Sequence, residues 1–241
     1  MLRKILILSL PLLSLYSCGD RLCFKTAGVT EELEIDLQSA EIIEVHDLID
    51  LRIIQSPDQK AIVRGGSNFI KKISIAQDEN QLTIRDNNIC RQPKNSSDKI
   101  EVEIYTSEVK IINFFGHGNL FAENLELSSL EFNSLRTGMD IYISGSIDTL
   151  RFFMEKGSPD LYLSGNSDYL YIYHFGSGFV YAEGLQTDRI HLNHNSTGNF
   201  HVYPIEELFV ELYSRGNVYF YNKPESLGGP VVGSGRILEG Q

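Results

Sequence analysis

A repeat of about twenty residues limits what this chain can fold into more than any other feature of its sequence. Two apolar residues separated by one residue recur at that spacing, and such a step is typical of a short strand with one buried face. The pairs are Leu130 and Phe132, Leu150 and Phe152, Leu170 and Ile172, Ile190 and Leu192, and, after a shorter step of 18, Leu208 and Val210. A unit this short cannot bury its apolar face alone, so successive units must stack.

A second set of apolar pairs alternates with the first and follows the same period. It comprises Leu120 and Ala122, Ile141 and Ile143, Leu161 and Leu163, Val180 and Ala182, Phe200 and Val202, and Val218 and Phe220. Small residues such as Gly118, Gly178 and Gly198 stand between the sets, and glycine favours tight turns. Each unit therefore predicts two short strands joined by turns. No segment keeps a helical apolar period, so the sequence predicts an all-β fold, a parallel β-solenoid with coils of roughly twenty residues.

The N-terminal third predicts β-structure with looser repeats. Short alternating apolar runs indicate strands over residues 33–37, 42–45, 51–54, 61–63, 73–75, 82–84 and 100–105. No linker divides the chain, so we expect a single folded domain over residues 35–241.

The first residues carry an export signal. Arg3 and Lys4 precede an apolar run that ends at Leu15, and this run is too short to span a bilayer but typical of a secretory signal. The residues around Cys18, Leu-Tyr-Ser-Cys, resemble the lipobox of bacterial lipoproteins, in which the signal is cleaved before an acylated cysteine. The resemblance predicts a signal peptide over 1–17, a lipid anchor at Cys18 and a lipidated leader over 18–34, whereas an ordinary signal peptide with a chance cysteine is the alternative.

Two cysteines remain once Cys18 is set aside. Cys23 and Cys90 form an even pair in a chain expected to reach an oxidising compartment, where disulfides persist. We therefore expect a disulfide between them, with two free thiols as the alternative.

The charge of the chain disfavours one class of partner. The formal net charge is −11 at pH 7, which disfavours a nucleic-acid partner held through its phosphates. An anionic membrane surface would also repel the chain, so attachment to a membrane is expected through covalent lipid.

Alternation along the strands predicts columns of outward side chains, one per coil. One column is aromatic and contains Phe121, Tyr142, Tyr162, Tyr181, His201 and Tyr219, while Tyr171 and Tyr173 belong to outward columns of the other strand set. The candidate ligand platform consists of Tyr142, Tyr162, Tyr181, His201, Tyr219, Tyr171 and Tyr173, which could hold sugar rings. The alternative is that like residues stack on one another and only stabilise the sheet.

Metal binding has weak candidates only. His174 and His194 are 20 residues apart, in one column with Ser134 and Met154, but no further ligand completes a site around them. Asp148, Asp168 and Asp188 also repeat at 20 and could hold Ca²⁺, although aspartate is equally a good turn former. The sequence predicts no metal site and no cofactor.

The order and spacing of several motifs resemble a known family. Cys23-Phe24-Lys25, Cys90 and the turns Gly116-His117-Gly118, Gly176-Ser177-Gly178 and Gly233-Ser234-Gly235 are similar to the putative auto-transporter adhesin, head GIN domain, over residues 35 to 238. Members are common as short bacterial lipoproteins. The resemblance implies a single-stranded right-handed parallel β-helix and an adhesin-like role.

Three function classes follow. The first is an exported, lipid-anchored cell-envelope protein, an outer-membrane lipoprotein that binds glycan or a surface protein without catalysis. The second is a structural envelope protein with no discrete ligand. The third is a polysaccharide-active β-helix enzyme, which would need paired carboxylates or a base with a charge-stabilising cluster. The sequence shows no such concentration and no hydrolase or phosphate-loop motif, so we expect no enzyme.

Overall fold

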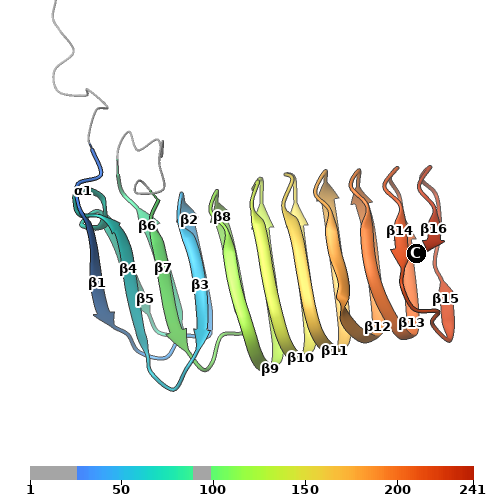
Figure 1. The fold of residues 1–241 in the computed structure, drawn as a ribbon, viewed down its shortest axis with the longest axis horizontal. Coiled ribbons are helices and arrows are strands. Elements are labelled where there is room, and N and C mark those ends of the chain that lie inside the picture. Colours follow the sequence, from blue (N-terminus) through green and yellow to red (C-terminus); the bar gives the residue numbers. More distant parts are fainter. Residues whose placement is uncertain (1–25, 89–98) are drawn as a thin grey trace, which may run out of the picture.

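The protein is a β-solenoid of about six turns, with parallel bridges about 20 residues apart. This architecture is seen in a computed structural model that describes residues 26–88 and 99–241. The coils stack side by side along one long axis, from the N-terminal strands at one end to the C-terminus at the other (Figure 1). The predicted all-β solenoid is therefore confirmed.

Each full coil is one long strand bent at a corner. The coils are β9 (Leu120–Leu135), β10 (Asp140–Glu155), β11 (Asp160–Gly176), β12 (Val180–Ser196) and β13 (Phe200–Leu212), followed by β14 (Val218–Phe220), β15 (Ser226–Gly228) and β16 (Ile237–Glu239). We call the part of a coil before the corner the first flank and the part after it the second flank. The sequence predicts two strands per unit. In β10 and β11 the strand pairing continues around the corner through Gly145 and Gly165, whose φ angles of 144° and 112° favour glycine.

The register confirms the columns expected from the repeat. Ile141 pairs with Leu161 on the first flank, and Leu150 pairs with Leu170 on the second. The chain length of a coil varies at the corner, where the pairing slips between β9 and β10, between β11 and β12, and twice between β12 and β13. Those last two slips explain the shorter step of 18 before Leu208, because β13 passes the corner with fewer residues than β12.

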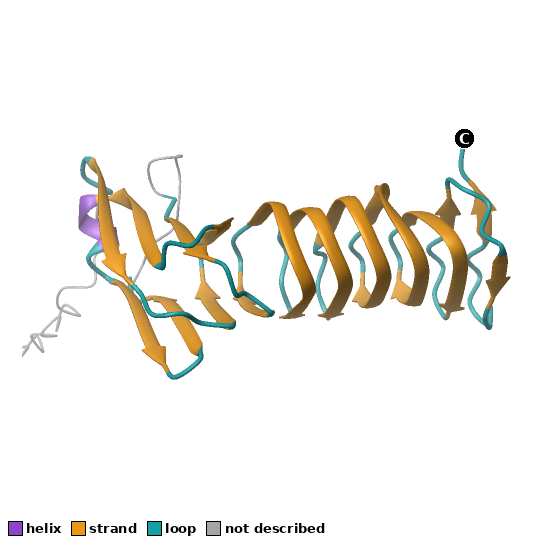
Figure 2. Cartoon of the chain, turned by 90° about the horizontal axis from the view of Figure 1, so that it is seen from below, coloured by secondary structure: helices purple, strands orange, loops and turns teal. Residues whose placement is uncertain are grey.

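The N-terminal third caps one end of the solenoid. It contains β1 (Thr30–Asp36), β2 (Ile42–Asp47), β3 (Asp50–Gln55), β4 (Lys60–Gly66), α1 (Ser67–Ile70), β5 (Ile73–Asp78), β6 (Gln81–Asp86), β7 (Glu101–Thr106) and β8 (Ile111–Gly116). β2 and β3 continue the parallel stack through β8 and β9. The pairs β1–β4, β4–β7 and β5–β6 are antiparallel instead, so this end departs from the regular coils (Figure 2).

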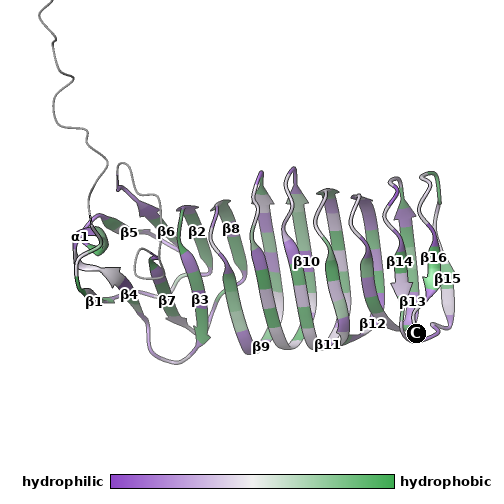
Figure 3. Cartoon of the chain, turned by 45° about the horizontal axis from the view of Figure 1, so that its top comes forward, coloured by the Kyte–Doolittle hydropathy of each residue, from purple (hydrophilic) through white to green (hydrophobic). Residues whose placement is uncertain are grey.

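The core runs along the axis between the two flanks. Inward residues such as Ile141, Phe132 and Phe152 are fully buried, and hydrophobic and hydrophilic residues alternate along the coil strands (Figure 3). Full burial of such side chains stabilises the fold by about 1.5–3 kcal/mol each. The column that continues Ser134 and Met154 places His174 and His194 in this core, both at 0% exposure.

The turn that closes each coil brings backbone against backbone. A Cβ placed on Gly118 would lie 1.7 Å from the carbonyl oxygen of Ile49, and one on Gly178 would lie 1.8 Å from that of Pro159. Just after this turn, side-chain oxygens link successive coils: Asn119 accepts a hydrogen bond from the N–H of Asp140 (3.1 Å), and Asp160 accepts one from the N–H of Phe179 (2.8 Å).

Several expectations fall outside the described residues. The signal peptide 1–17, the anchor Cys18 and both expected disulfide partners, Cys23 and Cys90, lie there, so these remain predictions. β1 begins at Thr30, so the end of the segment assigned to the leader is already part of the fold. Within residues 26–88 and 99–241, no helix is long and apolar enough to cross a membrane.

Candidate functional site

The outward aromatic column of the first flank forms a continuous stack, which we call the aromatic ladder: Phe121, Tyr142, Tyr162, Tyr181, His201 and Tyr219. Ring centroids lie 5.2 Å apart between Phe121 and Tyr142, 4.7 Å between Tyr142 and Tyr162, and 4.9 Å between Tyr162 and Tyr181. The stack continues to His201 at 5.7 Å and to Tyr219 at a further 5.0 Å. Neighbouring rings are nearly parallel, with interplanar angles between 3° and 16°.

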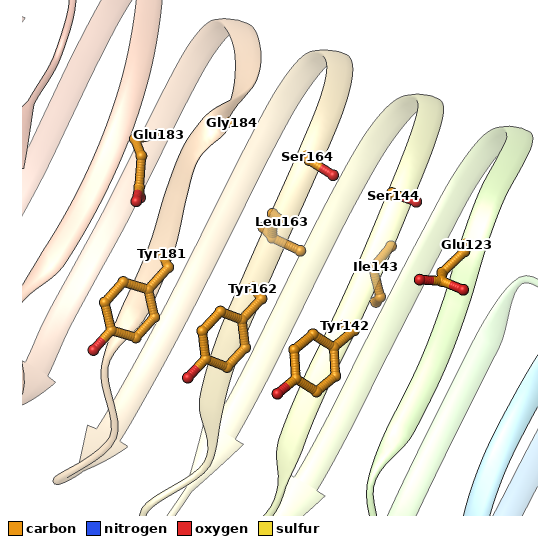
Figure 4. A pocket seen from close by; sticks show the side chains of 10 residues that line it. All are labelled: Glu123, Tyr142, Ile143, Ser144, Tyr162, Leu163, Ser164, Tyr181, Glu183 and Gly184. Atoms are coloured by element: carbon orange, nitrogen blue, oxygen red, sulfur yellow. The ribbon is translucent and has the colours of Figure 1, made fainter.

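The stacking decides which part of each ring a ligand can reach. A face of each ring is turned towards the next ring, whereas the edges and hydroxyls of Tyr142, Tyr162 and Tyr181 point outward together (Figure 4). At the Phe121 end, the guanidinium of Arg52 covers the ring at 4.8 Å from its centroid. A sugar ring, which stacks on an aromatic face, therefore finds these faces occupied along the ladder.

Carboxylates lie beside the hydroxyls of the ladder. Asp140 forms a hydrogen bond with Tyr142, and the charges of Asp140 and Asp160 act on both Tyr142 and Tyr162. Burial, followed by these carboxylates, raises the pKa of both tyrosines. The hydroxyls therefore stay protonated at neutral pH and can donate hydrogen bonds.

A hollow lies between the aromatic ladder and the corner. Its volume is about 360 Å³, within the range of small-ligand sites. Tyr142, Tyr162 and Tyr181 form one wall, and small residues form the floor, among them Ser144, Ser164 and Gly184. Glu123 and Glu183 stand at its two ends (Figure 4). The hollow exists because the outward residue two positions after the ladder is small on the two middle coils.

The sequence interpretation found the wall of this hollow and missed the rest. The ladder members Tyr142, Tyr162, Tyr181, His201 and Tyr219 lie together as expected. The floor and ends were not recognised, although Glu123, Ser144, Ser164 and Glu183 form a column two residues after the ladder at the same spacing. A column that changes from acidic to small and back to acidic was the signal that could have found them.

The other two proposed platform residues lie on the second flank and do not join the stack. The ring of Tyr171 meets Phe153 at a tilt, with 5.4 Å between centroids, and meets His191 edge-on at 5.1 Å. His191 in turn lies 2.8 Å from the carboxylate of Glu211, which lowers the pKa of that carboxyl. Tyr171 and Tyr173 therefore belong to a separate mixed surface, away from the hollow.

The weak metal candidates do not assemble. Asp148 and Asp168 are exposed and Asp188 is half-buried at the corner, and across the described residues no group of three or more His, Cys, Asp or Glu side chains could hold a metal ion. His174 and His194 pair in the core, where the imidazole of His194 stacks on Phe200 with 3.8 Å between centroids. Both nitrogens of His174 and Nε2 of His194 have no hydrogen-bond partner among the described residues.

Replacing Tyr162 by Leu is expected to lower the stability of the protein by about 1–3 kcal/mol, because two ring contacts of about 0.5–1.5 kcal/mol each are lost. Urea unfolding would measure the change. Tyr203→Leu is the control, since Tyr203 is half-buried at the corner of β13 and lies outside the ring stack. Equal losses in the two variants would show that the stacking itself contributes nothing.

Comparisons with known proteins support the fold. The family model described as "putative auto-transporter adhesin, head GIN domain" matches residues 41–224. A crystal structure of a putative adhesin from Bacteroides fragilis superposes with a TM-score of 0.74 at 16% identity, covering 88% of this chain and 97% of that one. A putative adhesin from Parabacteroides merdae (TM-score 0.59, 13% identity, 89% and 97% covered) and a putative lipid binding protein from Parabacteroides distasonis (0.59, 17%, 89% and 98%) are also similar. No curated protein matches the sequence.

Proposed function

Because the chain belongs to the family described as putative auto-transporter adhesin, head GIN domain, we propose that it is a cell-envelope binding module that holds a surface partner in the hollow beside the aromatic ladder. The observation that supports this most is the hollow itself, about 360 Å³ in volume, with tyrosine rings along one wall, serines on its floor and a glutamate at each end. A few placed polar groups in a concave site are typical of binding sites.

The module is proposed to bind without chemical turnover. Its surface partner is a glycan or a protein of the cell surface, and the net charge of −11 disfavours nucleic acid. The solved structures described as adhesins share the fold at under 20% identity, which supports the architecture and not a particular ligand.

An array of glycans and matrix proteins tests this function. The protein is expected to bind at least one array member saturably, and Ser164→Trp should abolish that binding because a large side chain then fills the floor of the hollow. Ser177→Trp is the control, since Ser177 is exposed at the closing turn and does not line the hollow. An array without saturable binding, or binding that survives Ser164→Trp, would contradict the proposal.

A structural role in the envelope is the second candidate, and one observation favours it. The rings of the aromatic ladder stack on one another and so stabilise the sheet. The presence of the aromatic column is therefore explained without a ligand. That role predicts that Tyr162→Leu changes stability and that no array member binds.

Membrane attachment is proposed to depend on Cys18, with the protein held on the outer membrane by acyl chains. Cys18→Ser is expected to move the protein from the membrane fraction to the soluble fraction, because two or more acyl chains are needed for stable anchoring and none could be added. Ultracentrifugation of cell lysates, with Cys23→Ser as the control variant, measures this. Retention of Cys18→Ser in the membrane fraction would exclude the anchor.

The side of the membrane on which the protein lies decides which partners it can meet. We expect a membrane-impermeant reagent to label the protein on intact cells as strongly as in lysates. Protection until lysis would confine the protein to the periplasm and would favour the structural role.

A further inference from the structure

The charged groups around the hollow are almost all negative. Glu123 and Glu183 stand at its ends, and Asp140 and Asp160 lie at the hydroxyl side of the ladder. Glu123 has one cationic partner, Arg52, at 3.5 Å. Among the described residues no lysine or arginine forms an ion pair with the other three carboxylates.

On the first flank, the coil segments from β9 to β14 contain no lysine or arginine, and the basic residues that adjoin them, Arg52 on β3 and Arg236 before β16, stand at the two ends of the stack. These segments are 119–123, 140–144, 160–164, 179–183, 199–203 and 217–221. The middle of this surface, where the hollow lies, is therefore negatively charged. A surface of one sign attracts partners of the opposite sign and speeds their encounter.

The geometry also discriminates between kinds of partner. The ring faces are covered by their neighbours in the stack, so a sugar ring has no face to lie on. Ring edges, tyrosine hydroxyls and carboxylates remain accessible, and these suit the ammonium or guanidinium groups and backbone amides of a polypeptide.

We propose that the hollow receives an extended segment of a partner protein that carries lysine or arginine side chains. This inference rests on the proposed binding function and gives its partner a chemical class. Glu123 and Glu183 are separated by three rungs of the solenoid, about 14 Å. Four residues of an extended chain cover the same length, and alternation puts residues i and i+4 on one side. Basic side chains four residues apart therefore reach both ends of the hollow.

Fluorescence anisotropy with a labelled peptide tests the proposal. The peptide has lysines four residues apart, separated by serine and threonine, and a second peptide has glutamates in place of the lysines. The lysine peptide is expected to bind and the glutamate peptide is not. Raising the ionic strength from about 0.1 M to about 1 M should weaken the binding, because exposed charges are then screened.

Removal of three carboxylates shows where the peptide binds. Asp140→Asn, Asp160→Asn and Glu183→Gln are combined in one variant, and the change Asp160→Asn keeps a side-chain oxygen that can accept the N–H of Phe179. The peptide is expected to bind this variant about tenfold more weakly. All three carboxylates are removed together because each exposed ion pair with a lysine of the peptide contributes little alone. The matched control combines Asp148→Asn, Asp168→Asn and Asp188→Asn, which removes the same charge at the corner, and its affinity should change less than about twofold. Thermal unfolding confirms that both variants fold.

Three outcomes would overturn the inference. Equal weakening in the two triple variants would show attraction by net charge alone. Tighter binding of an amino-sugar oligomer than of the lysine peptide, with the same dependence on the three carboxylates, would replace the protein partner by a glycan. Absence of peptide binding would refute the basic segment, while array binding that Ser164→Trp abolishes would leave the proposed function standing.

Discussion

Gly178→Ala is expected to destabilise the protein by about 3 kcal/mol or more and to lower its melting temperature by roughly 10 °C. The added Cβ would lie 1.8 Å from the carbonyl oxygen of Pro159 in the preceding coil. That oxygen belongs to the backbone, which is held in the stack by the strands on either side. Neither coil can therefore move away without breaking the backbone hydrogen bonds between neighbouring strands.

Gly138→Ala is the matched control for this substitution. Gly138 stands at the closing turn of another coil, but its nearest neighbour in the direction of a Cβ is the hydroxyl of Ser158 at 3.5 Å, an ordinary contact. Its stability should change by less than about 0.5 kcal/mol. Equal melting temperatures for Gly178→Ala and Gly138→Ala would show that the coils can separate at their turns.

The second large effect is a loss of stability in mild acid. Burial lowers the pKa of His174 and of His194 from 6.5 to about 4. Between those values the unfolded chain binds protons that the folded protein does not, so the free energy of unfolding is complete above pH 6.5 and falls as the pH drops towards 4. A pKa difference of this size corresponds to about 3 kcal/mol for each histidine.

Urea unfolding at pH 7 and pH 4.5 measures this dependence. His174→Met and His194→Met should each remove about half of the acid sensitivity, and methionine already occupies the neighbouring position of this column at Met154. His117→Gln is the control, because His117 is exposed. If the wild type and the His174→Met variant lose the same stability between the two pH values, the buried pair does not cause the loss.

The spacing of apolar pairs was sufficient to predict the solenoid. Residues that repeat at twenty must occupy one column when units stack, so the spacing alone predicts that Tyr142 lies above Tyr162 and His174 above His194, and the register confirms both. All seven short strands expected in the N-terminal third are present as well.

Strand direction at the N-terminal end could not be predicted in the same way. Apolar and polar residues alternate with period two in parallel and in antiparallel strands alike. The sequence pattern therefore could not show that β1 pairs with β4 in the antiparallel direction. A local signal did exist for β5 and β6, which are joined by only Glu79 and Asn80. A two-residue connection is typical of a hairpin. β8 and the short helix α1 were not expected at all.

The shape and charge of the hollow could not be predicted from the repeat, because the repeat gives only which residues share a column. Alternation places Tyr162 on the outer surface, but the torsion angles of its side chain decide whether a face or an edge meets solvent. The hollow forms because the side chains of one outward column are large, as at Tyr162, and those of the next column are small, as at Ser164. It is therefore recognised only when the side-chain sizes of neighbouring columns are compared. The repeat also does not tell whether Glu183 forms an ion pair with a lysine or arginine, because that depends on where the basic side chains of the described residues lie.

The slips of register at the corner divide each coil into a constant frame and an adjustable segment. Core residues of both flanks keep their pairing while the number of residues between them changes from coil to coil. The adjustable segment adjoins Ser144, Ser164 and Glu183, which line the hollow. Insertions and deletions there would reshape the hollow without changing the pairing of the core residues. The scaffold therefore separates the part of each coil that fixes the stack from the part that shapes its outer surface.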